Sequence, residues 1–116
     1  MKIRITVDST ELTATLNDSQ ATQDFLALLP LTLTLEDYAG TEKISDLPAR
    51  LSTEGAPEGS DPSGGDIAYY APWGNLAICY RDFGYSNGLV ILGKIDGGME
   101  ALSGSGPVNV TIEPMD

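Results

Sequence analysis

Residues 66–81 have the sequence DIAYYAPWGNLAICYR, and this stretch decides the fold class. Two runs rich in aliphatic and aromatic side chains, 66–70 and 75–81, flank the segment 71–74. That segment holds a proline and a glycine, which favour tight turns, while the flanking runs have the composition of strands. We therefore predict two adjacent strands joined by a turn.

Alternation of apolar and polar residues predicts further strands on both sides of this hairpin. Residues 3–7 and 12–16 alternate with period two, and the polar segment between them is short, so they are expected to pair as a second hairpin. The run 89–92 is apolar on both faces, which is typical of a covered strand. The other predicted strands are 31–36, 43–45 and 108–112.

One segment changes from the strand period to the helix period. Four apolar residues between positions 21 and 29 fall on one helical stripe, with polar capping residues before them and a proline after them, which predicts a helix over 19–29. A single helical turn is expected at 99–102. In contrast, 47–66 is dense in glycine, proline, serine and aspartate, and a loop of that length is either functional or partly mobile.

These elements indicate the fold class. About eight short strands with one or two short helices predict an all-β domain, built as a barrel or a sandwich. The length of 116 residues fits one domain, so residues 1–116 are predicted to fold as a single unit. A closed barrel would also leave no sheet edge exposed.

The composition excludes several kinds of chemistry. With no histidine and one cysteine, the chain has no Ser-His-Asp catalysis, no histidine-ligated zinc and no internal disulfide, and we expect neither a cofactor nor a metal. A formal net charge of −11 makes nucleic acid and membrane surfaces poor partners. The N-terminus alternates where a signal peptide would be continuously apolar, so we expect a cytoplasmic protein.

Several runs resemble a small bacterial family of proteins with the cyclophilin-like fold. The resemblance is carried by 71–78, APWGNLAI, and by 80–86, YRDFGYS, and it extends over nearly the whole chain, including 31–37 and 52–55. What it implies is a closed eight-stranded β-barrel capped by one or two short helices.

Two runs are also similar to true cyclophilins, which isomerise Xaa-Pro bonds. Residues 93–102, GKIDGGMEAL, resemble a late strand with its following turn, and 76–79, LAIC, resembles an earlier strand. Cyclophilins use an arginine in a Phe-His-Arg motif, a phenylalanine and a histidine. Here the phenylalanine position matches Ala77, the histidine position matches Leu89, and there is no Phe-His-Arg motif. The resemblance therefore implies the fold more strongly than the activity.

Arg81 is the most informative charged residue. Continued strand alternation would place it on the same side as Ala77 and Cys79, where its planar fork could hold a peptide carbonyl or a carboxylate. In an isomerase the same group could stabilise the amide nitrogen as conjugation is lost. Arg50 is the second candidate for this catalytic role. The alternative is a structural ion pair between Arg81 and Asp82 or another nearby carboxylate.

Six of the eight aromatic residues lie within 69–85. Such a cluster could line a groove for a proline ring or a planar ligand. The alternative is that about half of the rings point into the barrel and the others shield its mouth. The candidate ligand-binding residues are Tyr70, Trp73, Arg81, Phe83 and Tyr85.

Two further features are interpreted structurally. The acidic residues of 54–66 lack the ligand spacing of a calcium-binding loop, so a solvated loop is favoured. Cys79 lies within a predicted strand without an acid–base partner and is expected to be a packed, inert thiol.

Three functions are compatible with these observations. The first, which we favour, is a binding module without efficient isomerase activity that takes an extended peptide or a small acidic ligand in the aromatic groove. The second is a divergent peptidyl-prolyl cis/trans isomerase that uses Arg81 or Arg50. The third is a structural subunit or interaction protein whose barrel supplies only an interface.

Overall fold

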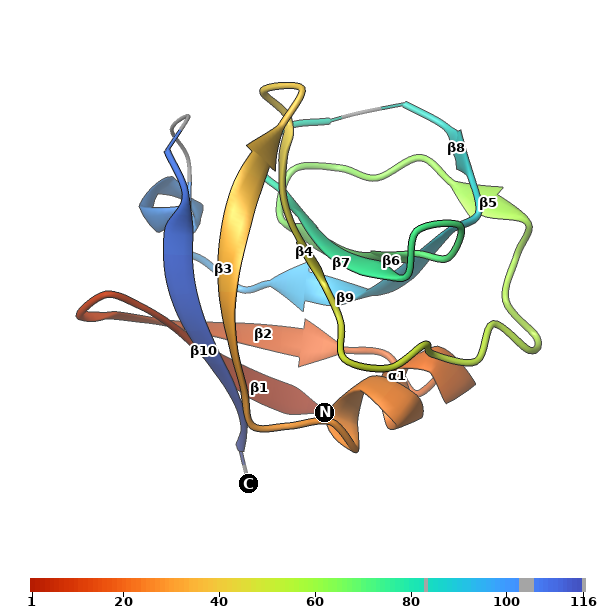
Figure 1. Cartoon of the computed structure of the whole chain (residues 1–116), viewed down its shortest axis with the longest axis horizontal. Coiled ribbons are helices and arrows are strands. Elements are labelled where there is room, and N and C mark those ends of the chain that lie inside the picture. The colour runs from red at the N-terminus through yellow and green to blue at the C-terminus, as the bar shows by residue number, and fades with distance from the viewer. Residues whose placement is uncertain (83, 103–105, 116) are drawn as a thin grey trace.

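Eight strands close into an antiparallel barrel in the computed structural model of the chain, which describes residues 1–82, 84–102 and 106–115 (Figure 1). The order around the barrel is β1-β10-β3-β4-β7-β6-β9-β2. The strands are β1 Lys2–Val7, β2 Thr10–Leu16, β3 Leu31–Tyr38, β4 Glu42–Asp46, β6 Asp66–Tyr70, β7 Asn75–Cys79, β9 Leu89–Ile95 and β10 Val108–Met115. The closed barrel implied by the resemblance is confirmed, and the sandwich alternative is wrong.

Two short helices accompany the barrel. The helix α1, Gln20–Leu26, begins at the N-cap Ser19, whose hydroxyl accepts from the Thr22 N–H, and it ends before the predicted limit at residue 29. The 3-10 helix η1, Met99–Ala101, occupies the predicted helical turn. In the described part of the chain, neither helix is long and apolar enough to cross a lipid bilayer.

Alternate residues of each strand fill the barrel, as the period-two pattern predicts. Leu76 and Ile78 on β7 are completely buried members of the core, and Phe25 from α1 packs with them into the same cluster. Each such side chain contributes about 1.5–3 kcal/mol when it leaves water. The remaining residues of β7 therefore face the outer side of the barrel wall.

A charged group lies inside the barrel near one end of the strands. The Lys43 side chain is completely buried and places its Nζ 3.5 Å from the Asp37 carboxylate. It also donates to the Gly106 carbonyl at 2.7 Å, while the Tyr80 hydroxyl donates to Asp37. The Tyr80 hydrogen bond, followed by the Gly40 N–H and Lys43, lowers the pKa of Asp37. The buried lysine thus has a charged partner, as burial of an ammonium group requires.

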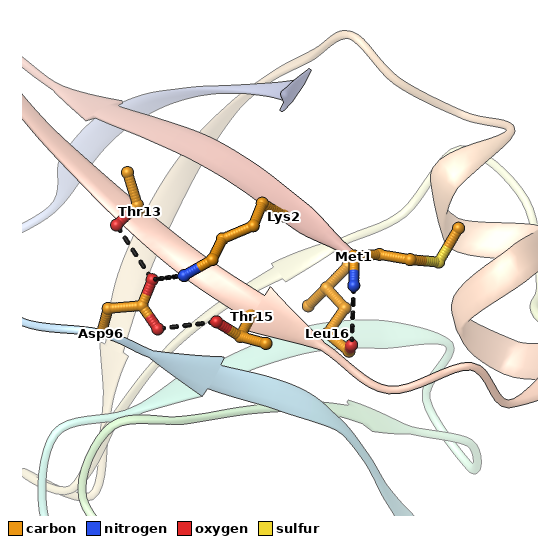
Figure 2. Close-up of polar contacts among 6 residues, drawn as sticks. All are labelled: Met1, Lys2, Thr13, Thr15, Leu16 and Asp96. Carbon is orange, nitrogen blue, oxygen red and sulfur yellow. Dashed lines mark hydrogen bonds and ion pairs between the residues drawn. The ribbon is translucent and has the colours of Figure 1, made fainter. Parts of the chain in front are cut away.

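The first hairpin is joined to the end of β9 by one carboxylate (Figure 2). Asp96 accepts hydrogen bonds from Lys2 at 2.8 Å, from Thr13 at 3.0 Å and from Thr15 at 2.8 Å. These three bonds, with the Lys2 bond contributing most, lower the pKa of Asp96 to about 2. Asp96 therefore ties β1 and β2 to the strand that closes the barrel beside them.

The long segment 47–66 forms a loop, as predicted, but it also contains a strand that the sequence analysis missed. The chain leaves β4, passes α1 and then rises at the right of the view to β5 (Figure 1). There β5, Gly59–Ser60, pairs with β8, Ser86–Asn87, in a separate two-stranded sheet. Two residues are too short a run for alternation to be visible in a sequence, which is why this pairing went unpredicted.

Candidate functional site

A pocket of about 90 Å³ opens beside Trp73 and is called the Trp73 pocket below. It lies where the end of β3, the start of β4, the β6–β7 turn and the start of β9 meet. Its volume exceeds what a single water needs and suits a small group of atoms. The residues that line it are Tyr38, Glu42, Tyr70, Trp73, Asn75, Ser86 and Leu89.

The β6–β7 turn that carries Trp73 is held from several sides. The Trp73 and Gly74 N–H groups donate to the Tyr70 carbonyl at 3.3 and 2.9 Å, as in a tight turn. The Ala71 N–H donates to the Gly88 carbonyl at 2.9 Å, and a Cβ at Gly88 would lie 2.8 Å from Pro72. The turn is thus packed directly against a glycine with positive φ, which fixes the position of the indole.

Three aromatic rings surround the pocket. The Trp73 ring stands edge to face with Tyr38, at 5.7 Å between centroids and 82°, and with Tyr70, at 5.1 Å and 85°. Both arrangements are the favoured T-shaped geometry of aromatic pairs. Trp73 nevertheless stays 52% exposed. A large aromatic side chain held rigidly and half in water is what a binding surface offers to a ligand.

Asn75 contributes an unused hydrogen-bond acceptor to the pocket. Its side chain is 3% exposed, and no described residue donates a hydrogen bond to its Oδ1. Asn75 faces the outer side of β7 because its neighbour Leu76 faces the core. A buried amide oxygen without a donor costs about 1–3 kcal/mol. The fold tolerates this cost at the wall of a pocket, where a ligand can supply the donor.

Glu42 supplies a carboxylate to the same pocket. It pairs in register with Tyr38 on one side and with Cys79 on the other, so it shares the outer face with Asn75. Burial raises the pKa of Glu42, although a hydrogen bond from the Cys79 thiol at 3.7 Å opposes the effect. Burial, with Glu42 and Asp66 nearby, raises the pKa of Cys79 to about 12, as expected for a packed thiol.

A second hollow of about 250 Å³ adjoins Asn75 on the other side. It lies over β3 and β4 and includes two more carboxylates, Glu36 and Asp46. Because Asn75 lines both hollows, the outer face around it carries acidic groups on two sides.

The structure brings some of the predicted site residues together and separates others. Tyr70 and Trp73 line the pocket. Tyr85 is 65% exposed and packs on β5, where a Cβ at Gly59 would lie 2.7 Å from its hydroxyl. Arg81 does not line the pocket, and Phe83 lies outside the described residues. Whether any of them binds a ligand stays a prediction.

The two candidate arginines occupy different surroundings. Arg50 donates from Nη1 to the Ala71 carbonyl at 2.7 Å, so it supports the turn that carries Trp73. Arg81 is exposed, with its guanidinium 5.8 Å from the centre of the Tyr80 ring, and no described carboxylate pairs with it. The alternative, an ion pair between Arg81 and Asp82, is not formed among the described residues. The Asp82 carboxylate accepts from the Gly64 N–H at 2.9 Å.

The predicted strand 75–81 ends two residues early, and this displaces Arg81. The structure has β7 ending at Cys79, and the N–H groups of Tyr80 and Arg81 both turn to the Thr41 carbonyl, at 3.0 and 3.3 Å. Strand alternation therefore does not extend to Arg81. The expectation that Arg81 lies on the side of Ala77 and Cys79 rested on that alternation and stays a prediction.

Sequence reasoning missed Tyr38, Glu42 and Asn75 as pocket residues. A signal existed for the first two, because the predicted strands 31–36 and 43–45 are separated by only a short segment. In the structure the end of β3 and the start of β4 pair in register, with Tyr38 opposite Glu42. Asn75 follows the Trp-Gly turn directly, and a polar residue opening an otherwise apolar strand was a further signal. The lack of a donor for its Oδ1 requires coordinates.

Comparisons with known proteins agree with the fold. Residues 5–113 match the model of the cyclophilin-like family. The chain is also similar to a hypothetical protein from Archaeoglobus fulgidus of known solution structure, with 20% identity, a TM-score of 0.68, and 99% of this chain and 95% of that chain covered. Identity this low shows a shared fold and nothing about function. None of the curated proteins matches. Since the family match spans nearly the whole chain, this protein belongs to the cyclophilin-like family.

Proposed function

We propose that the protein is a binding module, with the Trp73 pocket as its ligand site and without efficient proline isomerase activity. The observation that carries the proposal is the Asn75 Oδ1, which is buried at the pocket wall with no donor among the described residues. Polar atoms in protein interiors are normally paired, and an exception at a pocket marks a place for a ligand or an ordered water. The half-exposed Trp73 beside it adds a large contact surface.

Efficient isomerase activity is less well supported. Electrostatic catalysis of this reaction needs a donor aimed at the amide that twists. Arg50 is engaged with the Ala71 carbonyl, and Arg81 lies beyond the end of β7 over the Tyr80 ring. Neither is among the residues that line the Trp73 pocket. An interface role for the barrel has no comparable observation in its favour.

Fluorescence of Trp73, the single tryptophan, tests the binding module directly. We expect saturable changes in emission when a panel of proline-containing peptides and of neutral, cationic and anionic small molecules is titrated. A flat response across the whole panel would remove the proposal. The control is Glu113→Gln, which alters an exposed side chain of β10 outside the pocket and is expected to leave the titrations unchanged.

Two-dimensional NMR exchange on a proline-containing peptide separates the binding module from an isomerase. Uncatalysed exchange takes about tens to hundreds of seconds, so even weak catalysis is visible. We expect no exchange cross-peaks at catalytic protein concentrations. Cross-peaks that disappear in Arg81→Ala or Arg50→Ala would instead establish isomerase activity.

A cytoplasmic location is part of the proposal, supported by the single cysteine being a buried free thiol.

A further inference from the structure

The charge and hydrogen-bonding groups of the Trp73 pocket specify a class of ligand. We infer that the pocket takes an organic cation that carries N–H donors, a primary alkylammonium or a guanidinium group, with its positive charge between the aromatic rings and Glu42 and one N–H donating to the Asn75 Oδ1. This inference rests on the proposed function, since it names the ligand of the same site.

The three aromatic rings favour a cation. Trp73 has Tyr38 and Tyr70 almost perpendicular to it, at 82° and 85°, so rings of different orientation line one small volume. The face of an aromatic ring carries negative electrostatic potential, and tryptophan attracts cations most strongly. A small positive group in the pocket would therefore lie against these rings, which attract it wherever a ring face is turned toward it.

Glu42 adds a carboxyl group to the pocket. Burial raises the pKa of this carboxyl group, and the hydrogen bond from the Cys79 thiol at 3.7 Å opposes that shift. The neighbouring lysine, Lys43, turns into the barrel and pairs with Asp37, so it does not neutralise the pocket. Arg50 is held at the Ala71 carbonyl. A cationic ligand beside Glu42 would favour the ionised form of this carboxyl group.

Asn75 decides which kind of cation fits. Its Oδ1 accepts no hydrogen bond from any described residue, so a ligand gains by bringing a donor. Primary ammonium and guanidinium groups have N–H donors, whereas a quaternary ammonium has none. A site with a buried polar atom discriminates strongly against an analogue that leaves the atom unpaired. The pocket is therefore expected to prefer N–H cations to quaternary ones.

The carboxylates of the adjoining hollow also favour a ligand with a positive charge. Glu36 and Asp46 lie on the other side of Asn75. An anionic ligand, such as the acidic ligand considered from the sequence, would meet carboxylates from two directions. Like charges brought together in this way oppose binding.

Isothermal titration calorimetry with five small probes tests the inference on the intact protein. The probes are n-butylammonium, n-butylguanidinium, tetramethylammonium, 1-butanol and butyrate. We expect binding of the first two, affinity at least about tenfold lower for tetramethylammonium because it leaves Oδ1 unpaired, and no heat of binding for the alcohol or the anion. A capped peptide, acetyl-Gly-Lys-Gly-amide, distinguishes a lysine side chain of a peptide from a free amine as the source of the cation.

Two variants locate the interaction. Glu42→Gln should weaken n-butylammonium binding about tenfold, whereas Glu11→Gln, which removes one exposed carboxylate of β2, should not change it. Asn75→Leu should abolish the preference for n-butylammonium over tetramethylammonium. This second test compares the affinities of two ligands for the same folded variant. A change in the stability of the variant would therefore not by itself change the measured ratio.

The outcomes separate the inference from the proposed function. If butyrate or 1-butanol binds as well as n-butylammonium, the cation assignment is wrong while the pocket remains a binding site. The same holds if Glu42→Gln and Glu11→Gln behave alike. If none of these probes binds and Trp73 fluorescence is flat across the wider panel, both the inference and the proposed function are wrong.

Discussion

At the scale of a single residue, Asn75 is unusual because it is almost completely buried and yet no described residue donates a hydrogen bond to its Oδ1. A fold selected for stability alone would place an apolar residue at such a position, because burial of an unpaired polar atom is unfavourable. Leu76, its neighbour, has no polar side-chain atom and is fully buried in the core. Packing alone therefore does not account for the polar side chain at residue 75.

Replacement of Asn75 by leucine should stabilise the protein. Asn75→Leu removes the unpaired oxygen at similar volume, and we expect the free energy of unfolding in urea to rise by about 1 kcal/mol. The matched control is Asn17→Leu. The Asn17 Oδ1 accepts from the Ser19 and Thr22 hydroxyls, and its Nδ2 donates to the Ile91 carbonyl, so its loss should destabilise the fold. A clear loss of stability in Asn75→Leu would show that the oxygen has a partner.

At the scale of elements, the strands of the barrel were predictable and their ends were not. Period-two patterns located β1, β2, β3 and β10, because one face of each strand is buried and its register is therefore recorded in the sequence. β7 ends at Cys79, where the N–H groups of the next two residues, Tyr80 and Arg81, both donate to the carbonyl of Thr41, the residue just before β4. Hydrogen bonds to a residue that is distant in the sequence leave no periodic pattern in the sequence of the strand itself.

Asp96 should make the hairpin of β1 and β2 sensitive to acid. Its pKa of about 2 lies below the ordinary value of 3.8, so the folded state favours the ionised form. The stabilisation from this carboxylate is complete above about pH 4 and is lost as the pH falls through about 2. We expect Asp96→Asn to be less stable than the native chain at pH 6, with the difference in unfolding midpoint vanishing towards pH 2.

The control for this experiment is Glu113→Gln. Glu113 pairs with Arg4 at 3.8 Å, and both side chains are exposed, so the pair contributes little. Unfolding midpoints followed by circular dichroism across this pH range should show no comparable difference for Glu113→Gln. An equal pH profile for the two variants would contradict the role assigned to Asp96.

At the scale of the whole molecule, closure of the barrel and the distribution of charge are the two main properties. Three residue pairs join β2 to β9, and this short ladder completes the ring of strands. Four of the six basic residues are in ion pairs with described carboxylates, which leaves most of the seventeen acidic residues unneutralised. Composition alone predicted this acidity, but only the fold shows that acidic groups gather around Asn75.

Gly93 should be essential for closure of the barrel. It sits in the β2–β9 ladder, and a Cβ there would lie 2.3 Å from the Thr15 carbonyl oxygen and 2.7 Å from the Leu16 Cα. Because these are backbone atoms, Gly93→Ala should lower the free energy of unfolding by at least about 2 kcal/mol. Gly97→Ala, where a Cβ meets nothing within 4 Å, should change it by less than about 0.5 kcal/mol. Equal stability of the two variants in urea would contradict this view of closure.

Binding of a cation in the Trp73 pocket through Asn75 is reported most directly by the side-chain amide of Asn75. In ¹H–¹⁵N spectra of labelled protein titrated with n-butylammonium chloride, the Asn75 amide and the Trp73 indole resonances should shift together along one saturable curve. The amide of Asn109, whose Oδ1 already accepts from the Thr34 hydroxyl at 2.8 Å, should stay in place. Unshifted Asn75 and Trp73 resonances at saturating ligand, or shifts matched by 1-butanol, would contradict the account.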